Sequence, residues 1–303
     1  MSGSTTETRF VHPALFYRSA DEYQAKIVPF VMDGLDLGQP VAVVVPGPRL
    51  RLLEKELGAT ASRVKLLDMT HEGRNPGRII AGVLRRFADT YPDQHVRIVG
   101  EPVWPGRTSA EYPACVQHEA LINAAFAGRD ATILCPYDTE ELDATVIADA
   151  HVTHPVIWAD GPSDAYAPDI ALARYNQSLP EPPSSRVVAT PADVTEARRY
   201  ATREGRGLSE ERLQDLALIV TELITNSIVH TPGPATLAVW REGEYVICAV
   251  TDPGTFADPL AGRRPADPTV PGGRGLLLVN DLADLVRVHT GQTGTQIRAL
   301  LRV

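Results

Sequence analysis

Three prolines fall within the seven residues Leu179-Pro-Glu-Pro-Pro-Ser-Ser185. Proline fixes φ and has no backbone N–H to donate, so this segment favours an extended, semi-rigid connector over a helix or a central strand. The chain has 303 residues, about twice the ~150 residues of a typical domain. We therefore expect two domains, over residues 10–176 and 191–303, joined by a Pro/Ser-rich linker at 177–190.

Composition excludes several classes of protein. With 44% hydrophobic and 22% charged residues, the chain can bury real cores and is not a disordered polyelectrolyte. The net charge of −9 argues against direct binding of nucleic acid, which needs a basic face. No apolar run approaches the ~18 residues of a membrane span, and the start lacks a basic-then-apolar signal. We expect a cytoplasmic protein with no membrane partner.

Short aliphatic runs alternate with helical stretches in the first domain. The helical stretches are expected at about 19–37, 48–57, 76–90, 109–127 and 138–150, and the runs are bounded by Gly, Pro or Asp. Such runs suit central strands covered on both faces. They are Val41–Val45, Val64–Leu67, Val96–Val99 and Thr132–Cys135. The alternation predicts an α/β domain with a mostly parallel sheet and helices on both sides.

The carboxyl ends of these strands are where ligands bind in such sheets. Val45-Pro-Gly-Pro48 follows the first run without Gly-Lys-Ser/Thr, so we expect no P-loop nucleotide binding here. A pocket that mixes aromatic and polar groups could form there. Its candidate residues are Glu101, Trp104, Arg107, His118, Glu119 and Tyr137. In the alternative, Trp104 and Tyr137 cap the sheet while Arg107 pairs with a carboxylate.

Two further patterns in this domain imitate functional sites. Cys115-x-x-His118 has helical spacing and could be combined with Cys135 and His12 into a metal site. Buried free cysteine normally behaves as a small hydrophobe, so we expect no such site. Thr70–Pro76 imitates the phosphoacceptor box of histidine kinases, but Gly73 and the following Pro and Gly disfavour a continuous helix through His71. We therefore expect no phosphotransfer through His71.

The first domain resembles the MEDS sensory domain of bacterial signalling proteins over about residues 10–160. The resemblance is carried by His12-Pro-Ala-Leu-Phe-Tyr17, Asp68-Met69, Gly73-Arg-Asn-Pro76, Gly100-Glu-Pro-Val-Trp-Pro-Gly-Arg107, His118-Glu119 and Cys135-Pro-Tyr-Asp138. It implies a RecA-like sheet without a P-loop, and a role in sensing an unknown small molecule.

A long amphipathic helix is predicted from about 210 to 230 in the second domain. Ser209 is a suitable N-cap, and the two glutamates that follow it favour the positive end of the helix dipole. Glu222 and Asn226 are four residues apart, hence about 6 Å from one another on one face, and His230 continues the row. On its own this row could be a solvated helix edge.

Glycine-rich turns follow this helix in a fixed order. The predicted strand Tyr245–Thr251 leads into Asp252-Pro-Gly254, where glycine lets backbone approach a ligand and aspartate can accept a hydrogen bond from an amino group. Residues 255–271 have the composition of a surface lid. Gly272-Gly-Arg-Gly-Leu276 then precedes a helical run, where backbone N–H groups can face phosphate. Gly294-Thr295 begins a terminal strand to Leu301.

This order resembles the GHKL superfamily of ATP-binding domains, and most of all the anti-sigma-factor serine/threonine kinases. The resemblance implies an α+β Bergerat sandwich that binds ATP and Mg²⁺. By it, Asn226 coordinates Mg²⁺, Glu222 is the general base and Asp252 reads adenine. The remaining nucleotide-binding residues are implied to be His230, Gly254, Gly273, Arg274, Gly275, Leu276 and Thr295. Phe256 departs from the pattern, because it replaces a usual second glycine.

The resemblances together imply an anti-sigma factor whose kinase activity is controlled by the sensory domain. Its partners would be a sigma factor and an anti-anti-sigma protein of the STAS type, and a homodimer is compatible with the family. Two alternatives stay open. One is a non-catalytic nucleotide-binding interaction module, which Phe256 keeps open; the other is an orphan histidine-kinase-like ATPase without its own phosphoacceptor histidine.

Overall fold

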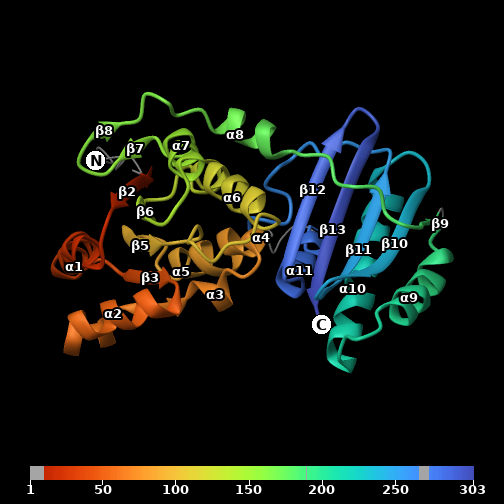
Figure 1. Cartoon of the computed structure of the whole chain (residues 1–303), viewed down its shortest axis with the longest axis horizontal. Helices are drawn as coiled ribbons and strands as arrows, with labels where there is room; N and C mark the ends of the chain where they lie inside the picture. Colours follow the sequence, from red (N-terminus) through yellow and green to blue (C-terminus); the bar gives the residue numbers. More distant parts are fainter. Residues whose placement is uncertain (1–9, 189, 266–272) are drawn as a thin grey trace, which may run out of the picture. The chain divides into compact units, whose positions relative to one another are not determined.

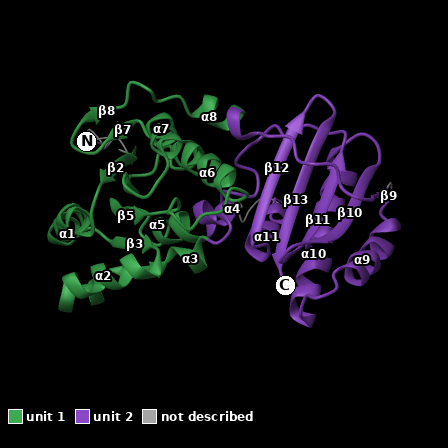
Figure 2. Ribbon diagram, in the orientation of Figure 1, with its two compact units in different colours: residues 1–73, 83–173 green, residues 74–82, 174–303 purple. Residues whose placement is uncertain are grey.

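The computed structural model describes residues 10–188, 190–265 and 273–303. The chain divides into two compact units, coloured separately in Figure 2. Unit 1 holds the described residues up to Gly73 together with Val83–Ala173, and unit 2 holds Arg74–Gly82 and the described residues from Arg174 onward. Among the described residues, no helix is both long enough and apolar enough to cross a bilayer.

Unit 1 is built on a mostly parallel sheet (Figure 1). The strand order is β4-β3-β5-β6-β2-β7-β8, β1 also pairs with β6, and β7–β8 is the antiparallel pair. The strands are β1 (Phe10–Val11), β2 (Pro13–Tyr17), β3 (Val41–Val45), β4 (Lys65–Asp68), β5 (Val96–Gly100), β6 (Ala131–Asp138), β7 (Val156–Ile157) and β8 (Gly161–Pro162). Every residue of β3 is buried, as a central strand covered on both faces requires. The predicted α/β class is confirmed.

The helices of this part of the chain follow the predicted alternation. They are α1 (Ala20–Asp36), α2 (Gly47–Leu57), the 3₁₀ turn Gly58–Arg63, α3 (Met69–Glu72), α4 (Pro76–Arg78), the π-helical turn Ile79–Arg85, α5 (Arg86–Ala88), α6 (Tyr112–Ala125), α7 (Ala144–Thr153) and α8 (Pro168–Tyr175). As predicted, no continuous helix passes through His71, because α3 ends at Glu72 and the next helix begins at Pro76.

The helix predicted at about 138–150 begins later, at Ala144. Asp138 ends β6 instead, and its Oδ1 accepts hydrogen bonds from the backbone N–H groups of Glu140 and Glu141 at 3.0 and 3.2 Å. Aspartate that binds backbone in this way favours a turn over a helix.

Unit 2 is an antiparallel sheet with helices against one face, which confirms the predicted α+β class. The strand order is β12-β13-β11-β10-β9. The strands are β9 (Arg186–Val188), β10 (Ala235–Glu242), β11 (Tyr245–Asp252), β12 (Leu285–Gly291) and β13 (Gly294–Arg302), and the helices are α9 (Asp193–Glu204), α10 (Glu210–His230) and α11 (Gly275–Leu282). Alternate residues of β11 (Val246, Cys248 and Val250) join the helices in one apolar core.

The segment expected to be a linker lies against the other face of this sheet. Asn176 exchanges two hydrogen bonds with the backbone of Thr290, at 2.8 and 3.0 Å. Arg298 of β13 donates to the carbonyl oxygen of Pro180. Arg186–Val188 then forms β9, the edge strand paired with β10. The segment is thus extended, as its prolines favour, and it is held along the sheet in front of β12 and β13 in Figure 1.

Residues 74–82 also belong to unit 2, although they come from the middle of the first half of the sequence (Figure 2). Asn75 is fully buried, and its Nδ2 donates to the carbonyl oxygen of Asn280 at 2.7 Å. Its Oδ1 accepts from the backbone N–H of Val286 at 3.3 Å. Arg74 pairs with Asp284 at 3.0 Å. This short segment therefore completes hydrogen bonds of α11 and β12.

Candidate functional site

A cavity of about 470 Å³ in unit 2 lies among α10, the ends of β11 and β13, and the start of α11. Eight of the ten residues predicted from the motifs of this domain line it: Asn226, His230, Asp252, Gly254, Gly273, Gly275, Leu276 and Thr295. The cavity lies within the 300–1,000 Å³ typical of small-molecule sites. Of the other two, Glu222 has its Oε2 close to Gly275, and Arg274 lines a second cavity together with Arg78 and Asp281.

Helix α10 supplies one wall. Its N-cap is Ser209, whose hydroxyl accepts from the backbone N–H of Arg212 at 3.3 Å. Leu223 and Ile224 are buried against the sheet, whereas Asn226 is half-buried and faces the cavity. His230, the last helical residue, is exposed at the cavity rim. Two residues of the predicted row, Asn226 and His230, thus line the cavity, and Glu222 does not.

Asp252, the last residue of β11, is held by two hydrogen bonds. Its Oδ2 accepts from the hydroxyl of Ser227 at 2.5 Å, and its Oδ1 accepts from the backbone N–H of Gly254 at 2.9 Å. Each carboxylate oxygen has a second lone pair, so Asp252 can still accept a hydrogen bond from a ligand. Ser227 was not identified as a site residue from the sequence. The sequence signal that could have identified it is a hydroxyl residue on the same helical face as the buried apolar residues Leu223 and Ile224.

At the glycine motifs, the cavity wall is formed by backbone atoms without side chains. A Cβ on Gly275 would stand 2.5 Å from Glu222 Oε2 and 3.4 Å from Asn226 Nδ2. A Cβ on Gly254 would stand 2.3 Å from a methyl carbon of Thr231. Both contacts are closer than real Cβ atoms show, so a side chain at either position would displace Glu222 or Thr231. The glycines therefore let backbone pass close to α10 at the cavity wall, and we call this part of the wall the cradle.

Helix α11 begins at this cradle. Its first residue is Gly275, and the side chain of its N-cap residue, Arg274, makes no capping hydrogen bond among the described residues. Gly273, two residues earlier, has φ +73°, a conformation that favours glycine. The N-terminus of a helix carries free N–H donors and the positive end of the dipole. This corner of the cavity can bind an anion such as a phosphate.

Phe256 does not disrupt the loop after Asp252. Its backbone N–H donates to the hydroxyl of Thr290 at 3.2 Å, and that hydroxyl also bonds the Thr295 hydroxyl at 2.9 Å. Thr295 in turn donates to the carbonyl oxygen of Gly254 at 2.9 Å. The Phe256 side chain is half-buried and adds an apolar surface to the cavity. Thr290 and Thr295 thus hold the loop in place at the position where a second glycine is usual.

The predicted lid is described only in part. Residues 266–272, which include Gly272, lie outside the described residues. In the part that precedes them, Arg264 lines the cavity and pairs with Asp258 at 2.7 Å. Both side chains are exposed.

The six residues predicted to line a sensory pocket in unit 1 fall into different environments. Glu101 is buried and lies 3.1 Å from Arg49 Nε, and it also accepts from the hydroxyl of Tyr23 at 3.4 Å. Burial raises the pKa of Glu101 to about 8, although the Arg49 charge opposes the shift. Asp138 pairs with the same guanidinium at 3.0 Å.

Trp104 and Arg107 interact with one another. The guanidinium of Arg107 lies 3.8 Å from the ring centroid of Trp104. It also donates to the carbonyl oxygens of Pro102 and Gly73, at 2.9 and 2.7 Å, and pairs with Glu111 at 3.3 Å. Arg107 thus pairs with a carboxylate, as in the part of the alternative that concerns this residue.

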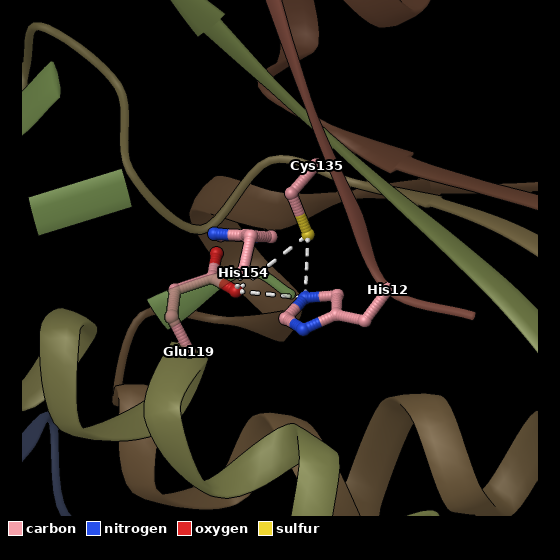
Figure 3. Close-up of side chains that lie close together, drawn as sticks. All are labelled: His12, Glu119, Cys135 and His154. Carbon is pink, nitrogen blue, oxygen red and sulfur yellow. Dashed lines mark hydrogen bonds and ion pairs between the residues drawn. The ribbon is translucent and has the colours of Figure 1, made fainter. Parts of the chain in front are cut away.

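Glu119 and Tyr137 line a cavity of about 10 Å³, which has room for about one water molecule. His118, like Glu119, is buried on α6. Glu119 also lies against His12, Cys135 and His154 (Figure 3). Cys115 and His118 are not part of that cluster. His12 and Cys135, which were considered from the sequence and set aside as ligands, therefore do meet, but with partners that the sequence did not indicate.

Comparison with known proteins agrees with both halves of this description. A search of curated proteins found no match to the chain. Residues 11–155 match the family model described as MEDS, MEthanogen/methylotroph, DcmR Sensory domain. Residues 187–301 match the family model described as histidine kinase-like ATPase domain. The chain is therefore a fusion of a MEDS sensory domain with a GHKL-type, histidine kinase-like ATPase domain.

Proposed function

We propose that this protein is an anti-sigma regulatory factor that transfers phosphate from ATP to a serine or threonine of an anti-anti-sigma partner. A small-molecule signal at the MEDS domain would bias this reaction. The observation that carries the proposal is the position of the Glu222 carboxylate. It stands beside Gly275 at the start of α11, next to a cavity that Asn226 and Asp252 line.

The described residues fit ATP with Mg²⁺. Asp252 offers a fixed acceptor for the amino group of adenine, and Asn226 offers an amide oxygen, a ligand type that suits Mg²⁺. The free N–H groups at the start of α11 suit the phosphates. Bound MgATP would supply the phosphoryl group and neutralise part of its charge.

Glu222 would act on the attacking hydroxyl. Serine is a weak nucleophile at neutral pH, so a carboxylate within hydrogen-bond reach must accept its proton as attack proceeds. Glu222 is half-buried on α10, one helical turn before Asn226. A base in this position acts beside the metal-binding amide and the helix N-terminus without lining the nucleotide cavity.

A direct test uses the full chain, MgATP with a labelled γ-phosphate, and purified candidate STAS-type proteins. We expect acid-stable phosphoserine or phosphothreonine on one of them. Glu222→Gln should retain MgADP affinity and lose the transfer, while Glu211→Gln, in the first turn of the same helix, should retain both. Transfer by Glu222→Gln at the unaltered rate would remove Glu222 from the role of base.

The second candidate is a non-catalytic module in which nucleotide only supports partner binding. The observation in its favour is the Phe256 side chain on the cavity wall. It predicts tight MgADP binding and partner capture with no phosphate transfer to any partner. Acid-labile phosphate on a partner would instead indicate an orphan histidine-kinase-like ATPase.

A further inference from the structure

Four side chains with metal-binding atoms converge inside unit 1 (Figure 3). His12 lies between β1 and β2, Glu119 is on α6, Cys135 is in β6 and His154 is the C-cap of α7. Each is at most 1% exposed. One ligand atom from each residue lies within 4.8 Å of those of the other three. Four separate parts of the chain thus bring two imidazoles, a carboxylate and a thiol to one buried point.

Four of the six distances between these atoms are close to the edges of a coordination tetrahedron, and all six are at most 4.8 Å. His12 Nε2 lies 3.2 Å from Glu119 Oε2 and 3.3 Å from Cys135 Sγ. Glu119 Oε2 lies 3.4 Å from His154 Nε2 and 3.6 Å from Cys135 Sγ. Metal–ligand bonds of about 2.0–2.3 Å place tetrahedral ligands roughly 3.3–3.8 Å apart. The four contacts are therefore close to those of a four-coordinate zinc site, and metal binding would need only a small adjustment of the side chains.

Outer hydrogen bonds direct both imidazoles toward this point. His154 Nδ1 lies 2.8 Å from the carbonyl oxygen of Ala150, which can only accept, so Nδ1 carries the hydrogen. His12 Nδ1 lies 3.2 Å from Asn123 Oδ1, and Asn123 is oriented by its Nδ2, which donates to the carbonyl oxygen of Thr153 at 3.0 Å. In the neutral rings both Nε2 atoms then present lone pairs. Metal-bound histidines have this arrangement.

Without a cation the cluster has fewer hydrogen-bond donors than its acceptors need. Two imidazole lone pairs and a carboxylate all accept, and the thiol of Cys135 has one weak donor. Among the described residues, His154 Nε2 makes no hydrogen bond. The two histidine rings lie 4.1 Å apart by their centroids, so charging both would place like charges together in a buried site. A divalent cation bound by carboxylate and thiolate satisfies all four groups with no net charge.

We propose that His12, Glu119, Cys135 and His154 bind one Zn²⁺ in a closed tetrahedral site. Mg²⁺ and Ca²⁺ prefer all-oxygen ligand sets, whereas two nitrogens, one sulfur and one oxygen suit Zn²⁺. The four ligands leave no open position, so the ion joins the β1–β2 connection, α6, β6 and the end of α7 and stabilises the sensory domain. The site belongs to unit 1, whereas the nucleotide residues belong to unit 2, and the proposal does not depend on the proposed kinase function.

The test uses the full chain, stripped of metal under reducing conditions and reconstituted with Zn²⁺ or Co²⁺. We expect one Zn²⁺ per chain and an increased melting temperature. Co²⁺ should give the visible bands of tetrahedral geometry and a near-ultraviolet thiolate-to-metal transition. Cys135→Ser should lose that transition and bind Zn²⁺ at least about tenfold more weakly. Cys115→Ser is the matched control, because this cysteine is equally buried but outside the cluster.

Several results would overturn the proposal. One is a folded wild-type chain, verified by circular dichroism, that takes up no stoichiometric Zn²⁺. Another is a thiolate transition that survives in Cys135→Ser or disappears in Cys115→Ser. Asn226→Ala should retain its Zn²⁺, since loss of the ion in that variant would place it at the nucleotide cavity. If Cys135→Ser fails to fold, the stoichiometry and the Co²⁺ spectra of the wild type and Cys115→Ser still decide the question.

Discussion

The hydroxyl of Ser227 on α10 donates a 2.5 Å hydrogen bond to the carboxylate of Asp252 at the end of β11. The bond joins helix to sheet at the point where adenine recognition is proposed. The other carboxylate oxygen accepts from the Gly254 backbone. Asp252 is thus oriented before any ligand arrives, and preorganisation of this kind favours binding.

Removing this orientation should weaken nucleotide binding. Ser227→Ala removes one hydrogen bond, worth about 1 kcal/mol, so MgADP affinity should fall roughly five- to tenfold. Asp252→Asn places an amide where the adenine amino group needs an acceptor, and the loss should be about ten- to a hundredfold. Calorimetric titration measures both. Undiminished affinity in Asp252→Asn would show that this carboxylate does not contact the base.

The close approach at Gly275 predicts a steric effect of a single methyl group. Gly275→Ala places a Cβ 2.5 Å from Glu222 Oε2, so either the carboxylate or the start of α11 must move. Because Ala is the better helix former, the fold should persist while MgADP affinity falls about tenfold. Gly100→Ala is the control, since a Cβ there meets nothing within 4 Å. Equal affinities in the two variants would contradict the cradle.

Asn75 should matter to unit 2 despite its place in the first half of the sequence. Asn75→Ala leaves the carbonyl oxygen of Asn280 and the N–H of Val286 without this buried partner. The cost should be about 1–3 kcal/mol. Hydrogen exchange should accelerate in peptides of α11 and β12 and stay unchanged in β3. Faster exchange confined to unit 1, or the same effect from the exposed Gln94→Ala, would contradict this.

Glu101 should make the stability of unit 1 depend on pH. Its pKa rises from 4.5 to about 8 on folding because the carboxyl is buried. The folded state therefore favours the protonated form, so this contribution is complete below pH 4.5 and is lost as pH rises toward 8. The slope is about 1.4 kcal/mol per pH unit within that window.

Glu101→Gln should flatten this dependence, and the exposed Glu56→Gln should follow the wild type. Urea denaturation between pH 5 and 8 provides the comparison. If Glu101→Gln loses stability as steeply as the wild type, Glu101 is ionised in the fold throughout this range, held by the Arg49 charge.

Local sequence patterns predicted those helices, turns and site residues whose positions depend on residues nearby in the sequence. The periodicity of Glu210–His230 and the glycines around Asp252 and Gly275 gave the elements and, by their order, the residues that meet at the cavity. Features that depend on distant pairing were missed. Asn75 contacts Asn280, which is 205 positions away in the sequence. His12 contacts Glu119 and His154, and these contacts depend on tertiary packing that the spacing of the residues does not indicate.

General rules about residue types also left out local contacts. The sequence rule that buried free cysteine is a small hydrophobe says nothing of the partners of Cys135, whose sulfur lies 3.3 Å from His12 Nε2 and 3.6 Å from Glu119 Oε2. Asp138 was expected to begin a helix, but its carboxylate binds the next backbone N–H groups and delays the helix to Ala144.

Because residues 74–82 belong to unit 2, the polypeptide passes from one unit to the other three times: after Gly73, after Gly82 and after Ala173. Dividing the chain at the proline-rich stretch would therefore not give two intact units. A recombinant fragment that starts near residue 187 would lack Asn75, so backbone atoms of Asn280 and Val286 would lose this hydrogen-bond partner. Gene dissection of this protein is therefore best done by point substitution within the whole chain.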